Sequence, residues 1–125
     1  MIVGIGVDII EVARIKRQLE LNPEFQYRIF SDREIDYCEA RADSGLSYAV
    51  RFAAKEAFMK ALGTGWNNEV SWREIESLKD DKGAPHLHIS GRTAVAVKQR
   101  GISAMHVSMS HEKEYAVAVV ILEQT

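Results

Sequence analysis

The sequence has few of the residues that define disulfide-rich, zinc-thiolate or membrane-spanning proteins. Its 125 residues include one cysteine, Cys38, and two prolines. A lone cysteine can form neither an intramolecular disulfide nor a site of several thiolates, so we expect a reducing, cytoplasmic environment. No apolar run approaches the roughly 20 residues that span a bilayer, which predicts a soluble protein with no membrane partner.

An excess of charge of one sign is also missing. Lysine and arginine together number 16, aspartate and glutamate 18, and the formal net charge is −2. There is no general basic field for nucleic acid, so an anionic ligand must be met by a local cluster of cations. The length and the 46% hydrophobic content indicate one globular domain over residues 1–125.

Several common motifs are incomplete. Gly4-x-Gly6 has Ile9 where a dinucleotide fingerprint needs its third glycine, and Gly63-Thr64-Gly65 lacks the lysine and hydroxyl residue of a P-loop. No Gly-x-Ser-x-Gly is present, which disfavours a serine hydrolase of that type. His106 and His111 lack the spacing of a zinc site, and Cys38 does not complete one.

The first ten residues predict a buried strand rather than a secretory signal, because they lack a basic leader and carry Asp8. Alternation places the apolar side chains on one face and Gly4, Gly6 and Asp8 on the other. The apolar set is Val3, Ile5, Val7 and Ile9.

Helical periodicity and capping signals predict the next elements. We expect a helix over 11–21, a short helix after Asn22-Pro23, a second after the capping-box sequence that starts at Ser31, and a long helix from Leu46 to a stop at Gly63. The break before the long helix is expected at Ser44-Gly45. A last helix is expected over 90–100, and strands are expected near 73–79, 86–90, 102–110 and 115–123. This order predicts an α+β fold, a mostly antiparallel sheet packed around the long helix.

Three polar residues on these elements suggest chemistry. Asp8 is a carboxylate on an apolar strand, and Glu56 and Lys60 lie one turn apart on the long helix, where Lys60 is expected to be partly desolvated. If Asp8 and Glu56 converge, they supply the oxygen ligands that Mg²⁺ prefers, and Lys60 can neutralise phosphates bound there. Taken singly, a helix-capping aspartate and a surface Glu–Lys pair are the commoner explanations.

Three segments in order resemble the holo-acyl-carrier-protein synthase family, the small, homotrimeric type of phosphopantetheinyl transferase. They are GIGVD at 4–8, RFAAKEAFMKALGTG at 51–65 and HVSMSH at 106–111. The resemblance implies transfer of 4′-phosphopantetheine from coenzyme A to a serine of an acyl carrier protein in fatty acid biosynthesis. It further implies release of adenosine 3′,5′-bisphosphate and active sites at the interfaces of a homotrimer.

Position by position, the resemblance also assigns roles. It implies Mg²⁺ on Asp8 and Glu56, with Glu56 and Lys60 as the catalytic residues. Lys60 then contacts the coenzyme A phosphates, and Arg51 and His106 meet the phosphate groups of its nucleotide end. The turn that holds Gly83 and Pro85 lies against the adenine, and Gly63 and Gly65 also belong to the coenzyme A site. Arg14, on the basic first helix, matches a position that docks the acidic carrier protein, and Arg17 on the same helix is expected to take part in that docking.

The sequence departs from the family pattern in two places. Lys82 stands where an asparagine is expected and Ala84 where a basic residue is expected, and residues 42–45 lack the lysines that relatives often carry there. The base that accepts the serine proton is left open between Glu56, a water on the metal and a water held elsewhere. Two alternative functions remain: a non-catalytic coenzyme A or nucleotide-binding trimer, and a Mg²⁺-dependent pyrophosphate hydrolase.

Overall fold

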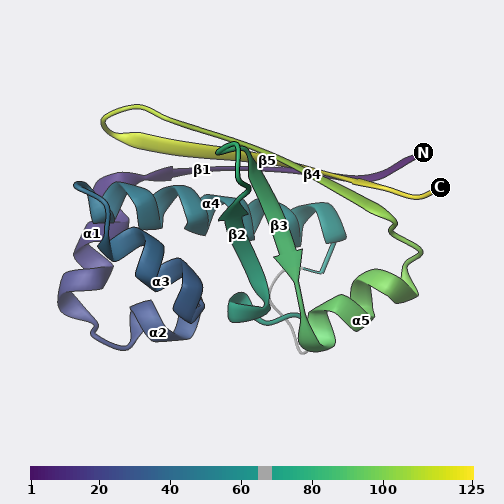
Figure 1. Cartoon of the computed structure of the whole chain (residues 1–125), viewed down its shortest axis with the longest axis horizontal. Coiled ribbons are helices and arrows are strands. Elements are labelled where there is room, and N and C mark those ends of the chain that lie inside the picture. Colours follow the sequence, from purple (N-terminus) through teal and green to yellow (C-terminus); the bar gives the residue numbers. More distant parts are fainter. Residues whose placement is uncertain (65–68) are drawn as a thin grey trace.

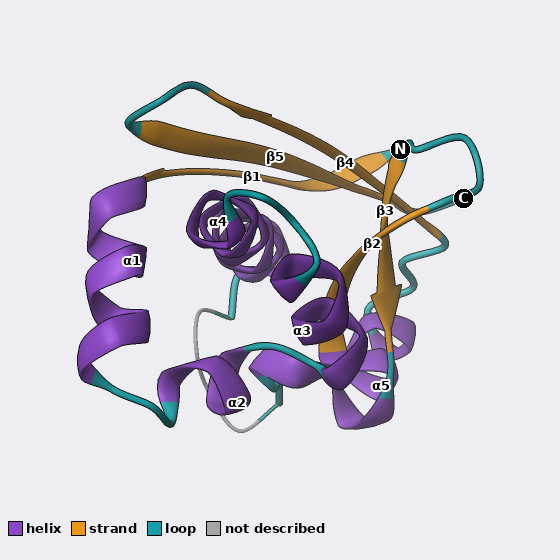
Figure 2. Cartoon of the chain, turned by 60° about the vertical axis from the view of Figure 1, so that its left-hand side comes forward, coloured by secondary structure: helices purple, strands orange, loops and turns teal. Residues whose placement is uncertain are grey.

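The computed structural model describes residues 1–64 and 69–125 and has an α+β architecture, as predicted. A three-stranded antiparallel sheet, in the order β1-β5-β4, covers one side of the long helix α4 (Ser44–Leu62). Figure 1 shows this helix running beneath the sheet, with the first three helices at one end, α5 toward the other, and β2 and β3 between them. Figure 2, which looks nearly along α4, shows that the sheet and the smaller helices enclose it.

Most predicted elements are present, with boundaries that agree with the prediction or differ from it by one or two residues. The strands are β1 (Ile2–Glu11), β2 (Ile75–Lys79), β3 (Pro85–Ile89), β4 (Ala104–His111) and β5 (Tyr115–Glu123). The helices besides α4 are α1 (Val12–Leu21), α2 (Phe25–Ile29), α3 (Asp32–Glu39), α5 (Gly91–Gln99) and the 3₁₀ turn η1 (Trp72–Glu74).

The helix starts differ from prediction in two places. The side chain of Asp43 accepts a hydrogen bond from the Leu46 backbone N–H at 3.1 Å, so α4 already begins at Ser44 and the expected break at Ser44-Gly45 lies in its first turn. Asn22 forms a turn instead of a helix cap, and α2 starts at Phe25. The capping box at Ser31 is confirmed, because Ser31 and Glu34 each bond the other's backbone N–H.

The strands form two sheets, where the sequence predicted one. β2 and β3 pair only with each other among the described residues, and their pairing is antiparallel. β5 lies at the centre of the larger sheet, with Ile121 opposite Ile5 of β1 and His106 of β4. The periodicity that identifies a strand contains no information about which strand pairs with it.

The orientation of β1 contradicts the prediction of a buried strand. Val3, Ile5, Val7 and Ile9 are 44–66% exposed, while the opposite face, with Gly4, Gly6 and Asp8, packs on α4. A Cβ on Gly6 would stand 2.0 Å from the Ala57 carbonyl oxygen. The strand therefore turns its glycines inward because the helix backbone approaches closely enough to exclude a side chain.

The core is built around α4. Ala49, Ala53, Ala57 and Phe58 are completely buried, and Val120 and Leu122 of β5 lie against the same helix with no exposed surface. Alanines along the sheet-facing side allow the short separation from β1 that the glycines require. Within 1–64 and 69–125, no helix is both long enough and apolar enough to cross a membrane.

Candidate active site

The first group of predicted site residues converges where β1 crosses α4. The Lys60 ammonium donates to the Asp8 carboxylate (Nζ to Oδ1) at 3.1 Å and to the Val7 backbone carbonyl at 3.0 Å. The Lys60 side chain is 52% exposed and the Asp8 side chain 15% exposed. The prediction that Lys60 is partly desolvated is therefore only half right, because the ammonium lies at the mouth of the site and Asp8 lies within it.

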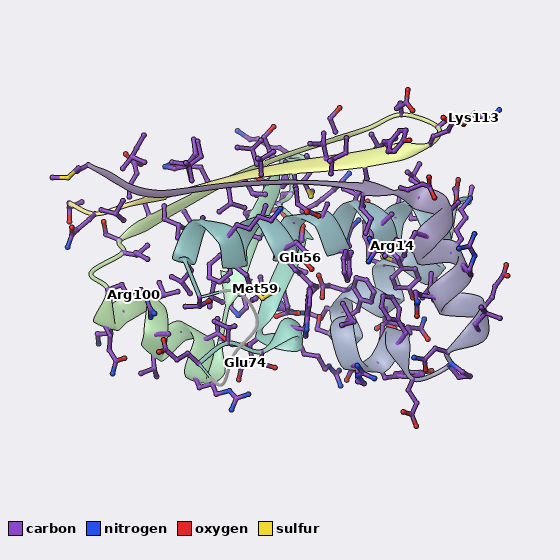
Figure 3. All side chains as sticks on the ribbon, turned by 180° about the vertical axis from the view of Figure 1, so that it is seen from behind. Arg14, Glu56, Met59, Glu74, Arg100 and Lys113 are labelled. Atoms are coloured by element: carbon purple, nitrogen blue, oxygen red, sulfur yellow. The ribbon has the colours of Figure 1, made fainter. Side chains whose placement is uncertain are left out.

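Glu56 is half-buried beside the same pair. Burial, and next the negative charge of Asp8, raise the pKa of Glu56 above its ordinary value, while the charges of Lys60 and Arg14 act in the opposite direction. Figure 3 shows Glu56 on the side of α4 that faces away from the viewer in Figure 1, in the part of the molecule that also carries Arg14. Two carboxylates and two cations thus share one small region.

The donors in this region suit Mg²⁺. Mg²⁺ is usually held by one or two carboxylates and completes its coordination with water and substrate phosphates. The negative charge of Asp8 disfavours the ionised form of Glu56, a repulsion that a bound divalent cation would relieve. No cluster of three or more histidine, cysteine or acidic side chains occurs in the described part of the chain, so a metal here would rely on these two carboxylates and on non-protein ligands.

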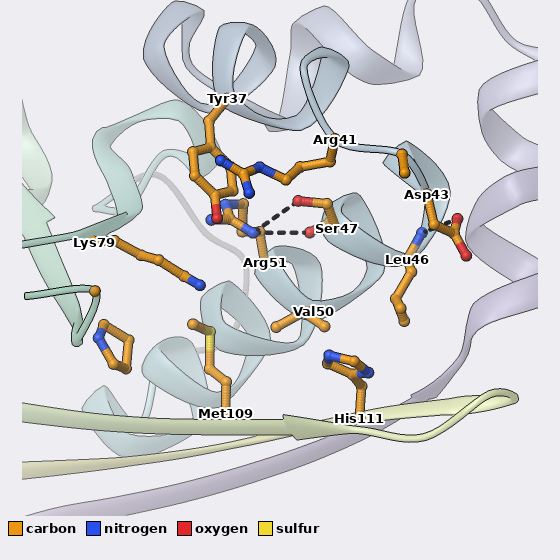
Figure 4. Close-up of a pocket in the computed structure, with 13 residues that line it drawn as sticks. Tyr37, Arg41, Asp43, Leu46, Ser47, Val50, Arg51, Lys79, Met109 and His111 are labelled. Carbon is orange, nitrogen blue, oxygen red and sulfur yellow. Dashed lines mark hydrogen bonds between the residues drawn. The ribbon is translucent and has the colours of Figure 1, made fainter.

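The second group lies around a pocket of about 600 Å³ between α3, α4 and the β2–β3 turn. Figure 4 shows Tyr37 and Arg41 on one side of it and Met109 and His111 of β4 on the other. Arg51, Gly83 and Pro85, three residues predicted to bind the nucleotide, all belong to the lining. Gly83 has a φ of +82°, which allows the tight turn that borders the pocket.

Cations gather on one wall of this pocket. The guanidinium carbons of Arg51 and Arg41 lie 4.1 and 4.3 Å from the ring centre of Tyr37, and the Lys79 ammonium lies 5.9 Å from it. Burial acts to raise the pKa of the Tyr37 hydroxyl, but Lys79, Arg51 and Arg41 outweigh it and lower the pKa. Within the described structure no carboxylate lies within ion-pair distance of these three cations.

Arg51 is held in place by hydrogen bonds that leave some of its N–H donors without an acceptor in the described part of the chain. It is 4% exposed, and one terminal nitrogen donates to the Ser47 hydroxyl at 3.0 Å and to the Ser47 carbonyl at 3.2 Å. Its Nε is buried and has no hydrogen-bond partner among the described residues. The one acid of the lining, Asp43, is occupied by the Leu46 N–H and by Lys16 at 3.3 Å. The wall can therefore accept phosphate oxygens without first breaking an ion pair.

The other predicted nucleotide contacts lie elsewhere. His106 points from β4 to the exposed face of the large sheet, where its Nε2 lies 2.5 Å from Glu123 Oε1. Gly63 ends α4 in the left-handed conformation with φ +82°. Gly65 lies outside the described residues.

Sequence reasoning missed Tyr37, Arg41, Lys79 and His111 as lining residues. Arg41 immediately precedes the segment in which relatives carry lysines, and this was the available signal. Lys79 is the last residue of β2 before the turn that holds Gly83. Tyr37 has no comparable mark, because an aromatic residue on a short helix usually indicates packing.

The two groups are separate within one chain. The described lining of the pocket includes neither Asp8 nor Glu56 nor Lys60. Arg14 and Arg17 are exposed on α1, as predicted, and Arg14 is near enough to Glu56 for its charge to lower the pKa of that carboxyl. The basic helix therefore borders the carboxylate group.

Comparisons with known proteins identify the family of this chain. The 4′-phosphopantetheinyl transferase superfamily matches residues 4–120. The holo-[acyl-carrier-protein] synthase of Geobacter sp. (strain M21) is 43% identical over 125 residues, which cover 99% of this chain and 100% of that protein.

Solved structures give the same result. The crystal structure of holo-[acyl-carrier-protein] synthase from Neisseria meningitidis has a TM-score of 0.93 at 36% identity and covers 99% of this chain and 100% of that one. The synthase from Bacillus anthracis, solved in complex with CoA (3′,5′-ADP), has a TM-score of 0.84 at 42% identity and covers 100% of this chain and 99% of that one. Because the family match spans most of its length and the fold agrees, this chain, in which Asp8, Glu56 and Lys60 lie together, belongs to the 4′-phosphopantetheinyl transferase superfamily.

Proposed function

We propose that this chain transfers 4′-phosphopantetheine from coenzyme A to a serine of an acyl carrier protein, as a step of fatty acid biosynthesis. The observation that carries the proposal is the presence of two complementary parts in one fold. The carboxylate group, Asp8, Glu56 and Lys60, can bind a metal and a pyrophosphate, and a pocket with an unpaired cationic wall suits the phosphates of the nucleotide end. Full-length similarity to proteins named for this activity supports it.

In this reaction the serine oxygen attacks the β-phosphorus of coenzyme A, and the bond from that phosphorus to the bridging oxygen breaks. The leaving group is adenosine 3′,5′-bisphosphate, and the serine proton passes to Glu56 or to water. When bound on Asp8 and Glu56, Mg²⁺ would supply positive charge to the pyrophosphate. Lys60 stabilises the negative charge that develops at the reacting phosphate, and Arg51 holds the nucleotide end in position.

We further propose a homotrimer whose active sites combine residues of neighbouring subunits. The apolar sheet face, consisting of Val3, Ile5, Val7 and Ile9 of β1 with Val117, Val119 and Ile121 of β5, is exposed or half-buried in the single chain. A continuous apolar face of this kind is typical of a subunit interface. His106 lies on the same face, and the separation of the pocket from the carboxylate group suggests that each is completed by a neighbour.

Two smaller parts of the proposal concern the partner and the compartment. Arg14 and Arg17 would receive an acidic carrier protein on the exposed face of α1, because complementary charge increases the association rate and sets orientation. The single, buried and unpaired Cys38 supports a reducing compartment, and we propose the cytoplasm.

The decisive experiment incubates an apo acyl carrier protein with the chain, coenzyme A and Mg²⁺ and weighs the carrier by mass spectrometry. We expect the mass to increase by one phosphopantetheine group with the wild type, and expect no increase with Asp8→Ala or Glu56→Ala. Nucleotide release without a carrier would favour a pyrophosphate hydrolase. Tight nucleotide binding with no adduct on any carrier would favour a non-catalytic binding protein.

A further inference from the structure

A charged pair lies completely buried behind the cationic wall of the pocket. Lys55 of α4 and Glu34 of α3 have no exposed side-chain surface, and Lys55 Nζ lies 2.6 Å from Glu34 Oε1. Lys55 also donates to the backbone carbonyls of Trp72, at 2.9 Å, and Ile75. All three ammonium hydrogens therefore have acceptors, which is the condition under which a buried lysine can remain charged.

Besides pairing with Lys55, Glu34 accepts hydrogen bonds from two other segments of the chain. Its Oε1 accepts from the Ser31 backbone N–H at 3.0 Å, and its Oε2 accepts from the Ser77 backbone N–H at 3.0 Å. The pair thus connects the start of α3, the middle of α4 and the strand β2. Two of these elements also carry cations of the wall, Arg51 on α4 and Lys79 on β2, and α3 carries Tyr37, against which both lie.

On each helix, the buried residue and the wall residue are about one turn apart. Tyr37 follows Glu34 by three positions in α3, and Arg51 precedes Lys55 by four in α4, so each pair lies on one face of its helix. The 4.1 Å contact between Arg51 and the Tyr37 ring is therefore made one turn from the ion pair that joins the same two helices.

In β2, too, a residue that contacts the buried pair and a residue of the cationic wall lie on the same face. Ser77 and Lys79 are two positions apart in β2 and lie on one face of that strand. The hydrogen bond from Ser77 to Glu34 thus fixes the distance of Lys79 from α3, where Tyr37 contacts Lys79 and the two arginines. Like charges repel, so three cations stay close together only if the backbone segments that carry them are rigidly joined.

We propose that the Glu34–Lys55 ion pair is a positioning device for the cationic wall, which holds Arg51 and Lys79 at the spacing required to bind the phosphates of the nucleotide end of coenzyme A. The pair touches no ligand itself. The proposal rests on the proposed function for the identity of the ligand.

The test replaces both members of the pair. The double variant Glu34→Leu with Lys55→Met removes the buried charges together, so neither charge is left unpaired. The backbone N–H groups of Ser31 and Ser77 and the carbonyls of Trp72 and Ile75 lose these partners, so we expect the variant to be less stable than the wild type. We expect it to fold, to bind 3′,5′-ADP about tenfold more weakly by calorimetry, and to show a similar increase in KM for coenzyme A. Since the pair contacts no reacting atom, we expect kcat at saturating coenzyme A to stay within about threefold of the wild type.

A second variant keeps the test decisive if the double variant does not fold. Glu34→Gln retains an oxygen for Lys55 but presents an amide N–H to the Ser77 N–H, so it loses mainly the connection to β2. We expect it to weaken 3′,5′-ADP binding severalfold. The matched control is Tyr48→Phe, which removes partly buried hydrogen bonds with Glu39 and Gln26 at another contact between α4 and the small helices.

Three outcomes distinguish the ideas. Wild-type protein that neither binds 3′,5′-ADP nor transfers would overturn the proposed function. A wild type that binds, together with a folded double variant that binds within twofold of it, would overturn the positioning role alone. The role would also be wrong if Tyr48→Phe weakened binding as much as Glu34→Gln for an equal decrease in Tm.

Discussion

Individual charged residues in this protein are held by two different means. Lys60 meets Asp8 at the surface, where solvent screens the pair and lets the lysine exchange partners when a ligand arrives. Lys55 meets Glu34 in the core, where separating the charges would leave an unpaired ion with no access to water. The Lys60–Asp8 pair is therefore suited to bind a ligand, and the Lys55–Glu34 pair is suited to hold backbone segments in place.

The ionised side chain of Glu76 should make the stability of the fold depend on pH. Burial opposes ionisation, but hydrogen bonds from Arg33, at 2.7 and 3.0 Å, and from Ser31, at 2.6 Å, outweigh it and lower the pKa of Glu76. A lowered folded-state pKa contributes stability above the ordinary value of 4.5, and that stability is lost as the pH decreases through the folded-state value.

We therefore expect Glu76→Gln to lower the free energy of unfolding at pH 7 by about 1–3 kcal/mol, since hydrogen bonds to a charged group are lost. The difference from the wild type should shrink as the pH decreases below 4.5, the ordinary pKa of the group. Urea unfolding at fixed protein concentration measures both. An equal loss of stability at all pH values would show that the ionised form is not what stabilises the fold.

At the scale of elements, β1 and α4 come into close backbone contact, and Gly6 permits it. A Cβ there would stand 2.0 Å from the Ala57 carbonyl oxygen and 2.7 Å from the Ala61 nitrogen, both backbone atoms. We expect Gly6→Ala to destabilise the fold by about 1–3 kcal/mol or more, because the strand must move away from the helix.

The movement of β1 away from α4 in Gly6→Ala should also separate Asp8 from Glu56. The transfer rate should therefore decrease by more than the loss of folded protein explains. Gly83→Ala is a useful comparison, since its Cβ would meet no atom within 4 Å and its cost comes only from the positive φ. Gly6→Ala with unchanged stability and activity would contradict the close packing described above.

The basic face of α1 should act on the partner rather than on the nucleotide. Arg14→Glu reverses a charge that lies outside the lining of the pocket. We expect a higher apparent KM for carrier protein with a weaker salt dependence, and a nearly unchanged KM for coenzyme A. Steady-state kinetics at two salt concentrations measures this. If KM for coenzyme A increased and KM for carrier protein did not, the docking role of α1 would be wrong.

At the scale of the whole molecule, the apolar sheet face distinguishes an isolated chain from an assembly. Ile5 is 66% exposed in the single chain, so Ile5→Glu would cost little if that face remained in water. Because we propose that the face is buried between subunits, we expect this variant to sediment as a monomer and to lose most of its transfer activity.

Val95→Glu on α5 is the matched control. Val95 is a similarly exposed apolar residue, at 55%, but lies away from the large sheet. We expect it to remain a trimer with near-normal activity. A trimeric, active Ile5→Glu protein would show that the interface lies elsewhere.

Local patterns in the sequence were sufficient to identify much of the fold. The stop of α4 at Gly63, the capping box at Ser31 and the residues of β5 were predicted and are confirmed. These features depend on neighbours within a few residues, where backbone geometry and capping determine the outcome. From the sequence we considered the case in which Asp8 and Glu56 converge near Lys60, and in the structure Lys60 lies 3.1 Å from Asp8.

The sequence by itself determined which segments are helices and strands, the α+β class and the candidate carboxylates, because these depend on local periodicity and recognisable spacing. Only the tertiary structure decided which face of β1 turns inward, how the strands divide into two sheets, and which cations meet at the pocket. Tyr37, Arg51 and Lys79 come from three separate elements, and Lys55 pairs with Glu34, which is 21 positions away in the sequence. Such contacts arise when distant segments pack to exclude water, and no local pattern records which segments will meet.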